Sequence, residues 1–230
     1  MSSVVETLFV GKSSPLARPG HPDVPSGIVK TARAGKVWLS INGLQGDEQG
    51  DRMYHGGPEK ALHHYAAEHY AYWRAQYPDG PVAVVAGAFG ENISTLGMTE
   101  QNVHIGDVYQ VGSALVQVSQ GRQPCWKLNR LLQREDAALA MQNAGATGWY
   151  YRVLQEGWVA AGDRLALVER PQADWPMVRL IKLLFSPDAA TDLWQQASVI
   201  AQLTPNWQIT FSRRVQCGQV EDWTRRLYEP

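Results

Sequence analysis

The sequence predicts a mainly β fold followed by a small three-helix unit, an α+β arrangement overall. Short alternating or β-branched runs fill the first three quarters of the 230 residues, whereas helical spacing dominates after Pro171. The short strands lack the regular strand–helix alternation of a doubly wound fold, so a barrel or a folded sheet is favoured. We therefore expect a β-barrel-like domain with peripheral helices over residues 1–170 and a three-helix domain over residues 171–230.

The expected strands are short runs bounded by Gly, Pro or Asp. They cover residues 6–10, 28–31, 37–41, 103–111, 114–118 and 163–168. Gly112-Ser113 separates two of these runs, and a two-residue loop with a leading Gly suits a type II′ hairpin turn. The sequence thus predicts an antiparallel hairpin at this position.

Two helices are expected within the β part and three after it. Apolar and aromatic residues recur at helical spacing over 59–77, where Pro58 suits the first helical position. A second helix is expected over 134–144, ended by Gly145. In the tail after Pro171, the sequence predicts helices near 174–185, 188–203 and 220–227, separated by two Pro-containing breaks.

Composition favours a folded protein with a small-molecule partner. The hydrophobic fraction is 44%, the charged fraction 19% and the formal net charge -1, and Lys and Arg form no basic tract. Neither a nucleic-acid nor a membrane footprint is therefore expected. The N-terminal residues lack the pattern of a secretion signal, which predicts a cytoplasmic location. Two cysteines in different surroundings suggest free thiols in a reducing compartment.

Cys125 is the first candidate for chemistry. Cations stabilise a thiolate, and Arg122 and Lys127 flank this cysteine in the sequence. Pro124 fixes its own φ and lacks an N–H, so the segment after the strand should be a rigid loop that presents the thiol. The alternative is that Cys125 is a small buried apolar residue, as is also expected for Cys217.

The second informative stretch is the polar loop of residues 46–60. Gly56 and Gly57 permit close approach of a ligand, and the helix expected after them suits an anion, with Arg52 and Lys60 as charge partners. The alternative is a helix entry that needs Gly for its turn. The acidic residues of the loop do not have calcium-loop spacing, and neither a Walker loop nor a GxGxxG fingerprint is present.

The histidines do not form a recognisable metal motif. No HExxH pair is present, and the aromatic neighbours of His63, His64 and His69 favour packing or hydrogen-bonding roles. A Cys–His hydrolase built from Cys125 and His55 stays open, although the sequence offers no third orienting group.

Three segments occur together in one known order. They are the loop from Gly46-Asp47 to His55-Gly56-Gly57, then Gly90-Glu91-Asn92, then Gln120-Gly121-Arg122-Gln123-Pro124-Cys125. In this order and spacing the chain resembles the MOSC domain family (molybdenum cofactor sulfurase C-terminal domain), and within it the YiiM-like branch, over nearly its whole length. It departs from the pattern where Gly121 replaces a common Pro and Trp126 a common Tyr.

The resemblance implies a site as well as a β-barrel-like fold with a three-helix unit. Cys125 would bind the molybdenum of a molybdopterin cofactor, and Arg122 would tune this ligand, because a soft thiolate suits a redox metal. Seven further residues would hold the cofactor's phosphate and pterin: Lys12, Arg52, His55, Gly56, Gly57, Lys60 and Asn92.

The activity implied by the resemblance is reduction of N-hydroxylated compounds, such as N-hydroxylaminopurine-type bases. Electrons would come from a separate flavoprotein reductase, and the chain has no nucleotide-binding fingerprint of its own. Two alternatives stay open. Cys125 could carry a persulfide in a sulfur-transfer protein, or the barrel could be a module that only carries the cofactor.

Overall fold

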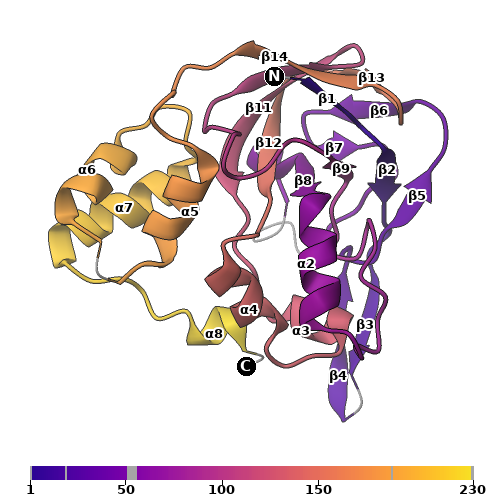
Figure 1. Cartoon of the computed structure of the whole chain (residues 1–230), viewed down its shortest axis with the longest axis horizontal. Helices are drawn as coiled ribbons and strands as arrows, with labels where there is room; N and C mark the ends of the chain where they lie inside the picture. Colours follow the sequence, from indigo (N-terminus) through magenta and orange to yellow (C-terminus); the bar gives the residue numbers. More distant parts are fainter. Residues whose placement is uncertain (1, 19, 51–55, 188, 229–230) are drawn as a thin grey trace.

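The structure is a computed structural model that describes residues 2–18, 20–50, 56–187 and 189–228. It confirms the predicted α+β fold class: a large, curled, mixed sheet is accompanied by helices below it and at one side (Figure 1). The strands lie before residue 170 and the four last helices after residue 176. The division into two domains at residue 170 stays a prediction.

The main sheet has nine strands in the order β1-β14-β10-β11-β12-β8-β9-β2-β5. Every neighbouring pair is antiparallel except β8 and β9, which are parallel. The strands are β1 (Ser2–Val4), β2 (Thr7–Val10), β5 (Thr31–Arg33), β8 (Leu62–Ala66), β9 (Ile93–Thr95), β10 (Val108–Val111), β11 (Ala114–Gly121), β12 (Trp149–Gln155) and β14 (Arg164–Glu169). The sheet curls so that its buried face encloses much of the apolar core (Figure 1).

Two smaller sheets complete the β part. One contains β6 (Val37–Ser40), β7 (Gly43–Leu44) and β13 (Gly157–Val159), and the other is the hairpin of β3 (Ser14–Arg18) and β4 (His21–Ser26). The predicted β10–β11 hairpin is confirmed: Val111 pairs with Ala114, and Gly112 has φ 53°. A positive φ at the first loop position alone is the signature of a type II′ turn.

The helices fall into two groups along the chain. The first group comprises the 3-10 turn η1 (Pro58–Lys60), α2 (Glu68–Gln76), α3 (Lys127–Leu132) and α4 (Ala137–Ala144). The second comprises α5 (Met177–Phe185), α6 (Thr191–Ser198), α7 (Pro205–Cys217) and the single turn α8 (Thr224–Leu227). α5, α6 and α7 stand together beside the sheet, whereas α8 lies below them, under α4 (Figure 1).

The predicted helix over residues 59–77 is wrong in its first half. Residues 58–60 form only a 3-10 turn, and Leu62–Ala66 form β8, which pairs with β12 on one side and β9 on the other. All five residues of β8 are buried, so the strand shows no alternation, and its apolar and aromatic residues merge with the helical spacing of α2. A short strand buried on both faces cannot be distinguished from a helix by periodicity alone.

Other boundaries also differ from the predictions. The expected strand at 28–31 begins only at Thr31, and α3 and α7 were not predicted. α7 begins at Pro205, which was interpreted as a break, because Pro is well accommodated in the first turn of a helix. The hydrophobic core joins the sheet and the tail: Val118 belongs to the same buried cluster as Ile181 and Phe211.

Candidate functional site

Cys125 lies in a tight loop between β11 and α3. The loop leaves the sheet after Gly121, and the backbone N–H of Arg122 donates to the carbonyl of Gly148 at 3.0 Å, beside the start of β12. The Cys125 carbonyl accepts from the N–H of Leu128 at 2.9 Å, so the cysteine directly precedes α3. Only 9% of Cys125 is exposed. The predicted rigid presentation of this residue therefore has a structural basis in hydrogen bonds on both sides.

Cys125 is part of the wall of a cavity of about 780 Å³, a volume that includes its open mouth. Four chain segments and four single side chains form this cavity. The lining residues are Ser26, Gly27, Ile28, Lys30, Asp47, Glu48, Gln49, Gly50, Lys60, His63, Phe89, Gly90, Asn92, Gln120, Arg122, Gln123, Cys125, Lys127, Tyr150 and Arg226. The chain passes close to itself at this wall: a Cβ on Gly27 would lie 1.8 Å from the carbonyl oxygen of Glu48. Only glycine fits there.

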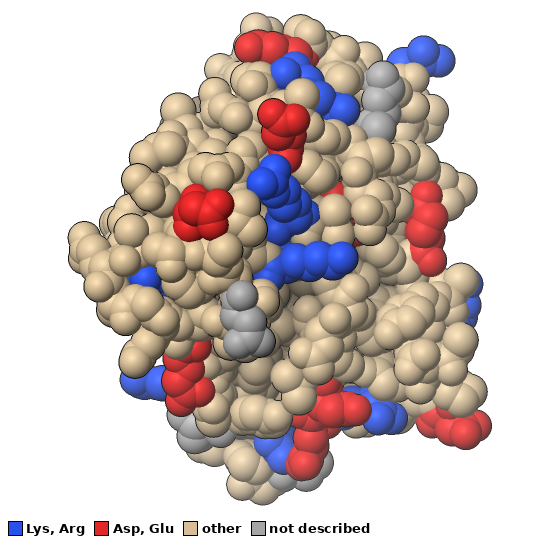
Figure 2. Space-filling view, turned by 60° about the vertical axis from the view of Figure 1, so that its left-hand side comes forward, with Lys and Arg blue, Asp and Glu red and all other residues tan. Residues whose placement is uncertain are grey.

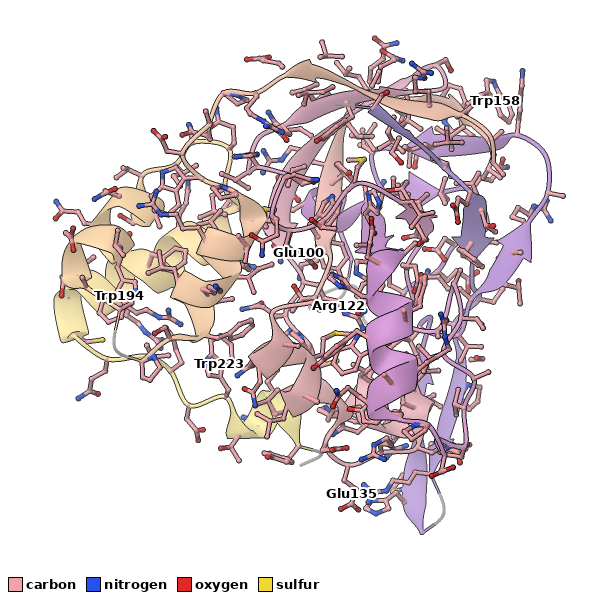
Figure 3. The ribbon with its side chains drawn as sticks, in the orientation of Figure 1. Glu100, Arg122, Glu135, Trp158, Trp194 and Trp223 are labelled. Carbon is pink, nitrogen blue, oxygen red and sulfur yellow. The ribbon has the colours of Figure 1, made fainter. Side chains whose placement is uncertain are left out.

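Arg122 is held in the wall by its guanidinium. Its Nη1 donates to the carbonyl of Phe89, and only 6% of the residue is exposed. The loop that supplies this carbonyl is itself fixed by the buried Glu91, which accepts from the backbone N–H of Phe89 at 3.0 Å and from the hydroxyl of Tyr70. Figure 3 shows Arg122 near the centre of the molecule, beside α2. Arg122 thus couples the Cys125 loop to residues 87–91.

Lys30 and Asp47 form a buried ion pair in the same wall. Their side chains are 6% and 2% exposed. Asp47 also accepts from the backbone N–H of Gly11 at 2.8 Å and from Nδ2 of Asn92 at 2.9 Å. Burial lowers the pKa of Lys30, and the Asp47 carboxylate opposes this effect. The carboxylate therefore keeps a cation at the cavity surface.

The side chain of Asn92 forms hydrogen bonds with other groups of the protein. Its Oδ1 accepts from the backbone N–H of His63 at 3.0 Å, and its Nδ2 donates to Asp47 and, at 3.2 Å, to the carbonyl of Phe9. The structure thus brings Asn92 to the cavity and makes it a support for the Lys30–Asp47 pair. A role in cofactor binding stays a prediction.

Basic groups concentrate around Cys125. Burial, followed by the charge of Arg226, lowers the pKa of Lys60 to about 8, while attraction to Cys125 acts in the opposite direction. Arg226 also has a lowered pKa, chiefly because it is buried. In the view with the helical side turned forward, Lys and Arg side chains gather near the middle of the face (Figure 2). Cations placed this close together favour an anionic ligand.

His63 and Tyr150 add two polar groups in an aromatic pair. Their rings are 4.9 Å apart, and both line the cavity. Burial and then Arg122 lower the pKa of His63 well below its usual value, so the imidazole is neutral. Its Nε2 is buried without a hydrogen-bond partner among the described residues. A buried unpaired nitrogen of this kind is ready to bond a ligand atom.

Several predicted residues do not meet at this cavity. Lys12 is exposed, forms an ion pair with Glu48 at 2.7 Å, and lines a different surface hollow. Gly56 and Gly57 are half-buried and are not among the lining residues; Gly57 has φ 91° and precedes η1. Arg52 and His55 lie outside the described residues. Cys125, Arg122, Lys60 and Asn92 are the predicted site residues that the structure brings together.

Lys30, His63, Tyr150 and Arg226 also line the cavity, and the sequence did not predict them there. Lys30 was counted within an expected strand, and Arg226 lies 101 positions after Cys125 in the helical tail. Only the resemblance to a family could have directed attention to them, because no local pattern marks a side chain that long-range packing brings to a site. Lys127 could be predicted, because it flanks Cys125 in the sequence.

Within the described ranges, no three His, Cys, Asp or Glu side chains come together as ligands of a metal ion. A single protein thiol, that of Cys125, lines the cavity. The same residues contain no helix with the length and apolar character that crossing a bilayer requires.

Comparisons with known proteins agree with the fold and the sequence pattern. The family model of the MOSC domain matches residues 51–166. The chain is 42% identical to Protein YiiM of Escherichia coli (strain K12) over 204 residues, which are 89% of this chain and 91% of that protein. It is 37% identical over 172 residues to a protein named Reductase from Gibberella moniliformis, covering 74% of this chain and 30% of that protein. A crystal structure of YiiM from Escherichia coli superposes with a TM-score of 0.83 at 36% identity, with 99% of each chain covered. The chain belongs to the MOSC domain family.

Proposed function

We propose that this protein is a molybdenum-cofactor-dependent reductase of N-hydroxylated compounds that receives its electrons from a separate flavoprotein. The observation that carries the proposal is the position of Cys125: the thiol lines a cavity that also contains Lys30, Lys60, Arg122 and Arg226. Membership of the MOSC family and similarity to a protein named Reductase support an oxidoreductase.

The cavity fits such a cofactor in three respects. A cysteine thiolate is a soft ligand that suits a redox metal. The lysines and arginines around it suit the phosphate of a pterin cofactor. The unpartnered Nε2 of His63 offers a hydrogen bond to a polar heterocycle, whether pterin or substrate.

Each described side chain has a role in this proposal. Cys125 would be the protein ligand to the metal, and Lys30 and Lys60 would bind the anionic phosphate of the cofactor. Arg122 would hold the Cys125 loop against residues 87–91 through its bond to Phe89. Arg52, His55, Gly56 and Gly57, which precede η1 in the sequence, and Lys12 would contribute further contacts with the cofactor.

The bound cofactor would supply the two-electron chemistry. The overall reaction takes an N-hydroxylamino group, two electrons and two protons to an amine and water, so the N–O bond breaks and nitrogen is reduced. The protein would orient the N–O group beside Cys125 and limit access of water, since only 9% of this residue is exposed. Electrons have to come from outside this chain, which is why a flavoprotein partner is part of the proposal.

The test is an anaerobic assay with a reduced viologen dye as electron donor and N-hydroxylaminopurine as substrate. Because the dye replaces the partner flavoprotein, the assay needs no knowledge of the natural donor. The proposal predicts conversion to the amine by protein from a cofactor-competent host, and loss of activity in Cys125→Ser. Absence of turnover, together with cyanide-releasable sulfur on Cys125, would instead support the sulfur-transfer alternative.

A further inference from the structure

The helical tail contacts the residues on both sides of Cys125. The guanidinium of Arg226, in α8, donates from Nε to the carbonyl of Pro124 at 3.1 Å and from Nη2 to the carbonyl of Gln123 at 2.9 Å. On the other side of the cysteine, the backbone N–H of Trp126 donates to the Arg226 carbonyl at 2.8 Å. Both residues before Cys125 and the residue after it are therefore bonded to one arginine.

A second contact ties the start of the same loop to the tail. Gly121 ends β11, and a Cβ at this position would lie 2.9 Å from Cγ1 of Ile181 in α5 and 3.3 Å from the Trp207 ring in α7. The side chain of Asn129 in α3 also donates to the carbonyl of Leu227 at 2.9 Å. The tail thus holds residues 121–129 at three places.

No carboxylate among the described residues forms an ion pair with Arg226. Its side-chain hydrogen-bond acceptors are the neutral carbonyls of Gln123 and Pro124. Arg122, a second cation, lines the same cavity. A partly buried cation is more stable when an anion lies beside it. The cavity that Arg226 lines is the place where such an anion would bind.

We infer that Arg226 is a positioning residue of the site: it clamps the Cys125 loop through the carbonyls of Gln123 and Pro124, and its charge faces the anionic cofactor. The inference rests on the proposed function for the identity of that anion. It extends the site to the tail, which lies outside the residues 51–166 that match the MOSC model. The clamp itself is a property of the protein without cofactor.

The experiment compares Arg226→Gln and Arg226→Lys with Arg225→Gln. Arg225 is the adjacent residue of α8, is exposed, and forms none of these contacts, so it is a matched control. Hydrogen exchange of the amides of residues 121–130 is measured in cofactor-free protein. Molybdenum retained after extensive dialysis is measured in protein from a cofactor-competent host.

The clamp predicts that exchange at 121–130 becomes about 10-fold to 100-fold faster in Arg226→Gln, because two bonds from a charged donor are lost. Exchange elsewhere and the melting temperature should stay close to those of Arg225→Gln. Arg226→Lys keeps the charge but lacks the planar fork, so it should retain molybdenum better than Arg226→Gln and still show fast exchange.

Equal exchange in Arg226→Gln and Arg225→Gln would overturn the clamp. Faster exchange throughout the chain would overturn it as well, because it would mean a general loss of stability. Equal molybdenum retention in all three variants would overturn the role of the charge. Wild-type protein without molybdenum would contradict the proposed function and with it the role of the charge, whereas the exchange measurement would still decide the clamp.

Discussion

The ammonium of Lys30 and the carboxylate of Asp47 form an ion pair that is almost completely buried in the wall of the cavity around Cys125. Asn92 and the backbone of Gly11 provide two further hydrogen bonds to Asp47, so its two oxygens are both used. The pair contributes both to the stability of the fold and to the geometry of the cavity, because the residues that hold Asp47 also fix the position of Lys30 in the cavity wall.

Removing the charge of Asp47 should be strongly destabilising. Asp47→Asn leaves the Lys30 ammonium buried beside a neutral amide, and breaking a buried pair costs on the order of 3 kcal/mol. Urea unfolding measures this cost, with the exposed Asp79→Asn as control. The double variant Lys30→Met and Asp47→Asn should be more stable than Asp47→Asn alone. A double variant at least as unstable as the single one would contradict this account of the pair.

Adding a methyl group at Gly121 should strain the contact between β11 and the tail. The Cβ of Gly121→Ala would lie 2.9 Å from Ile181, and overpacking of this kind costs about 1 to 3 kcal/mol. The measurement is a double-mutant cycle with Ile181→Ala, which makes room. The cost of Gly121→Ala should be smaller in the Ile181→Ala background. Equal costs in both backgrounds would show that Ile181 does not limit this position.

Two adjacent tyrosines provide a matched pair. The hydroxyl of Tyr151 bonds Nδ1 of the buried His64 at 2.9 Å, so Tyr151→Phe should cost about 1 to 3 kcal/mol of unfolding free energy. Tyr150 faces the cavity and its hydroxyl forms no hydrogen bond with the described residues, so Tyr150→Phe should change stability by less than about 0.5 kcal/mol. Thermal unfolding of both variants is the measurement. A larger loss for Tyr150→Phe would mean that its hydroxyl serves the fold.

Acid should destabilise the protein through its buried histidines. Burial lowers the pKa of His64 from 6.5 to about 3. Below the unfolded-state pKa, the unfolded chain binds a proton that the folded chain does not, so stability is complete above about pH 6.5 and falls as the pH decreases toward 3, by about 1.4 kcal/mol per pH unit. The lowered pKa of His63 acts in the same direction.

The pH dependence of urea unfolding between about pH 7 and pH 5 tests this prediction. In His64→Gln the free energy of unfolding should fall less steeply with acidification, because about one proton fewer is taken up on unfolding. The variant should be less stable at every pH, because it loses the hydrogen bonds to Tyr151 and Thr95. An unchanged dependence in His64→Gln would mean that His64 is protonated in the folded protein.

Local sequence patterns predicted much of the fold but less of the site. The β10–β11 hairpin and the end of α4 at Gly145 were predictable because each depends on a turn residue next to a strand or helix. β8 was not, because it is buried on both faces and its pairing with β9 and β12 is a long-range property. The four-helix composition of the tail was missed where Pro205 was interpreted as a break and not as the first residue of α7.

The site shows the same division. Cys125, Arg122 and Lys127 stand in one short segment, and their proximity could be predicted from the sequence. Lys30 and Arg226 reach the cavity only because the sheet and the tail fold around it, and no local pattern distinguishes them from surface cations. Lys12 is a different case: the structure pairs it with Glu48 on the surface, and its role as a phosphate ligand stays a prediction.

The most direct test of the central claim is the molybdenum and pterin content of protein expressed in a cofactor-competent host, measured for the wild type, Cys125→Ser and Cys217→Ser. Cys217 is the exposed second cysteine and serves as control. We predict near-stoichiometric molybdenum in the wild type and in Cys217→Ser, and its loss in Cys125→Ser. Wild-type protein without molybdenum, or equal molybdenum in all three proteins, would contradict the assignment of Cys125 as the metal ligand.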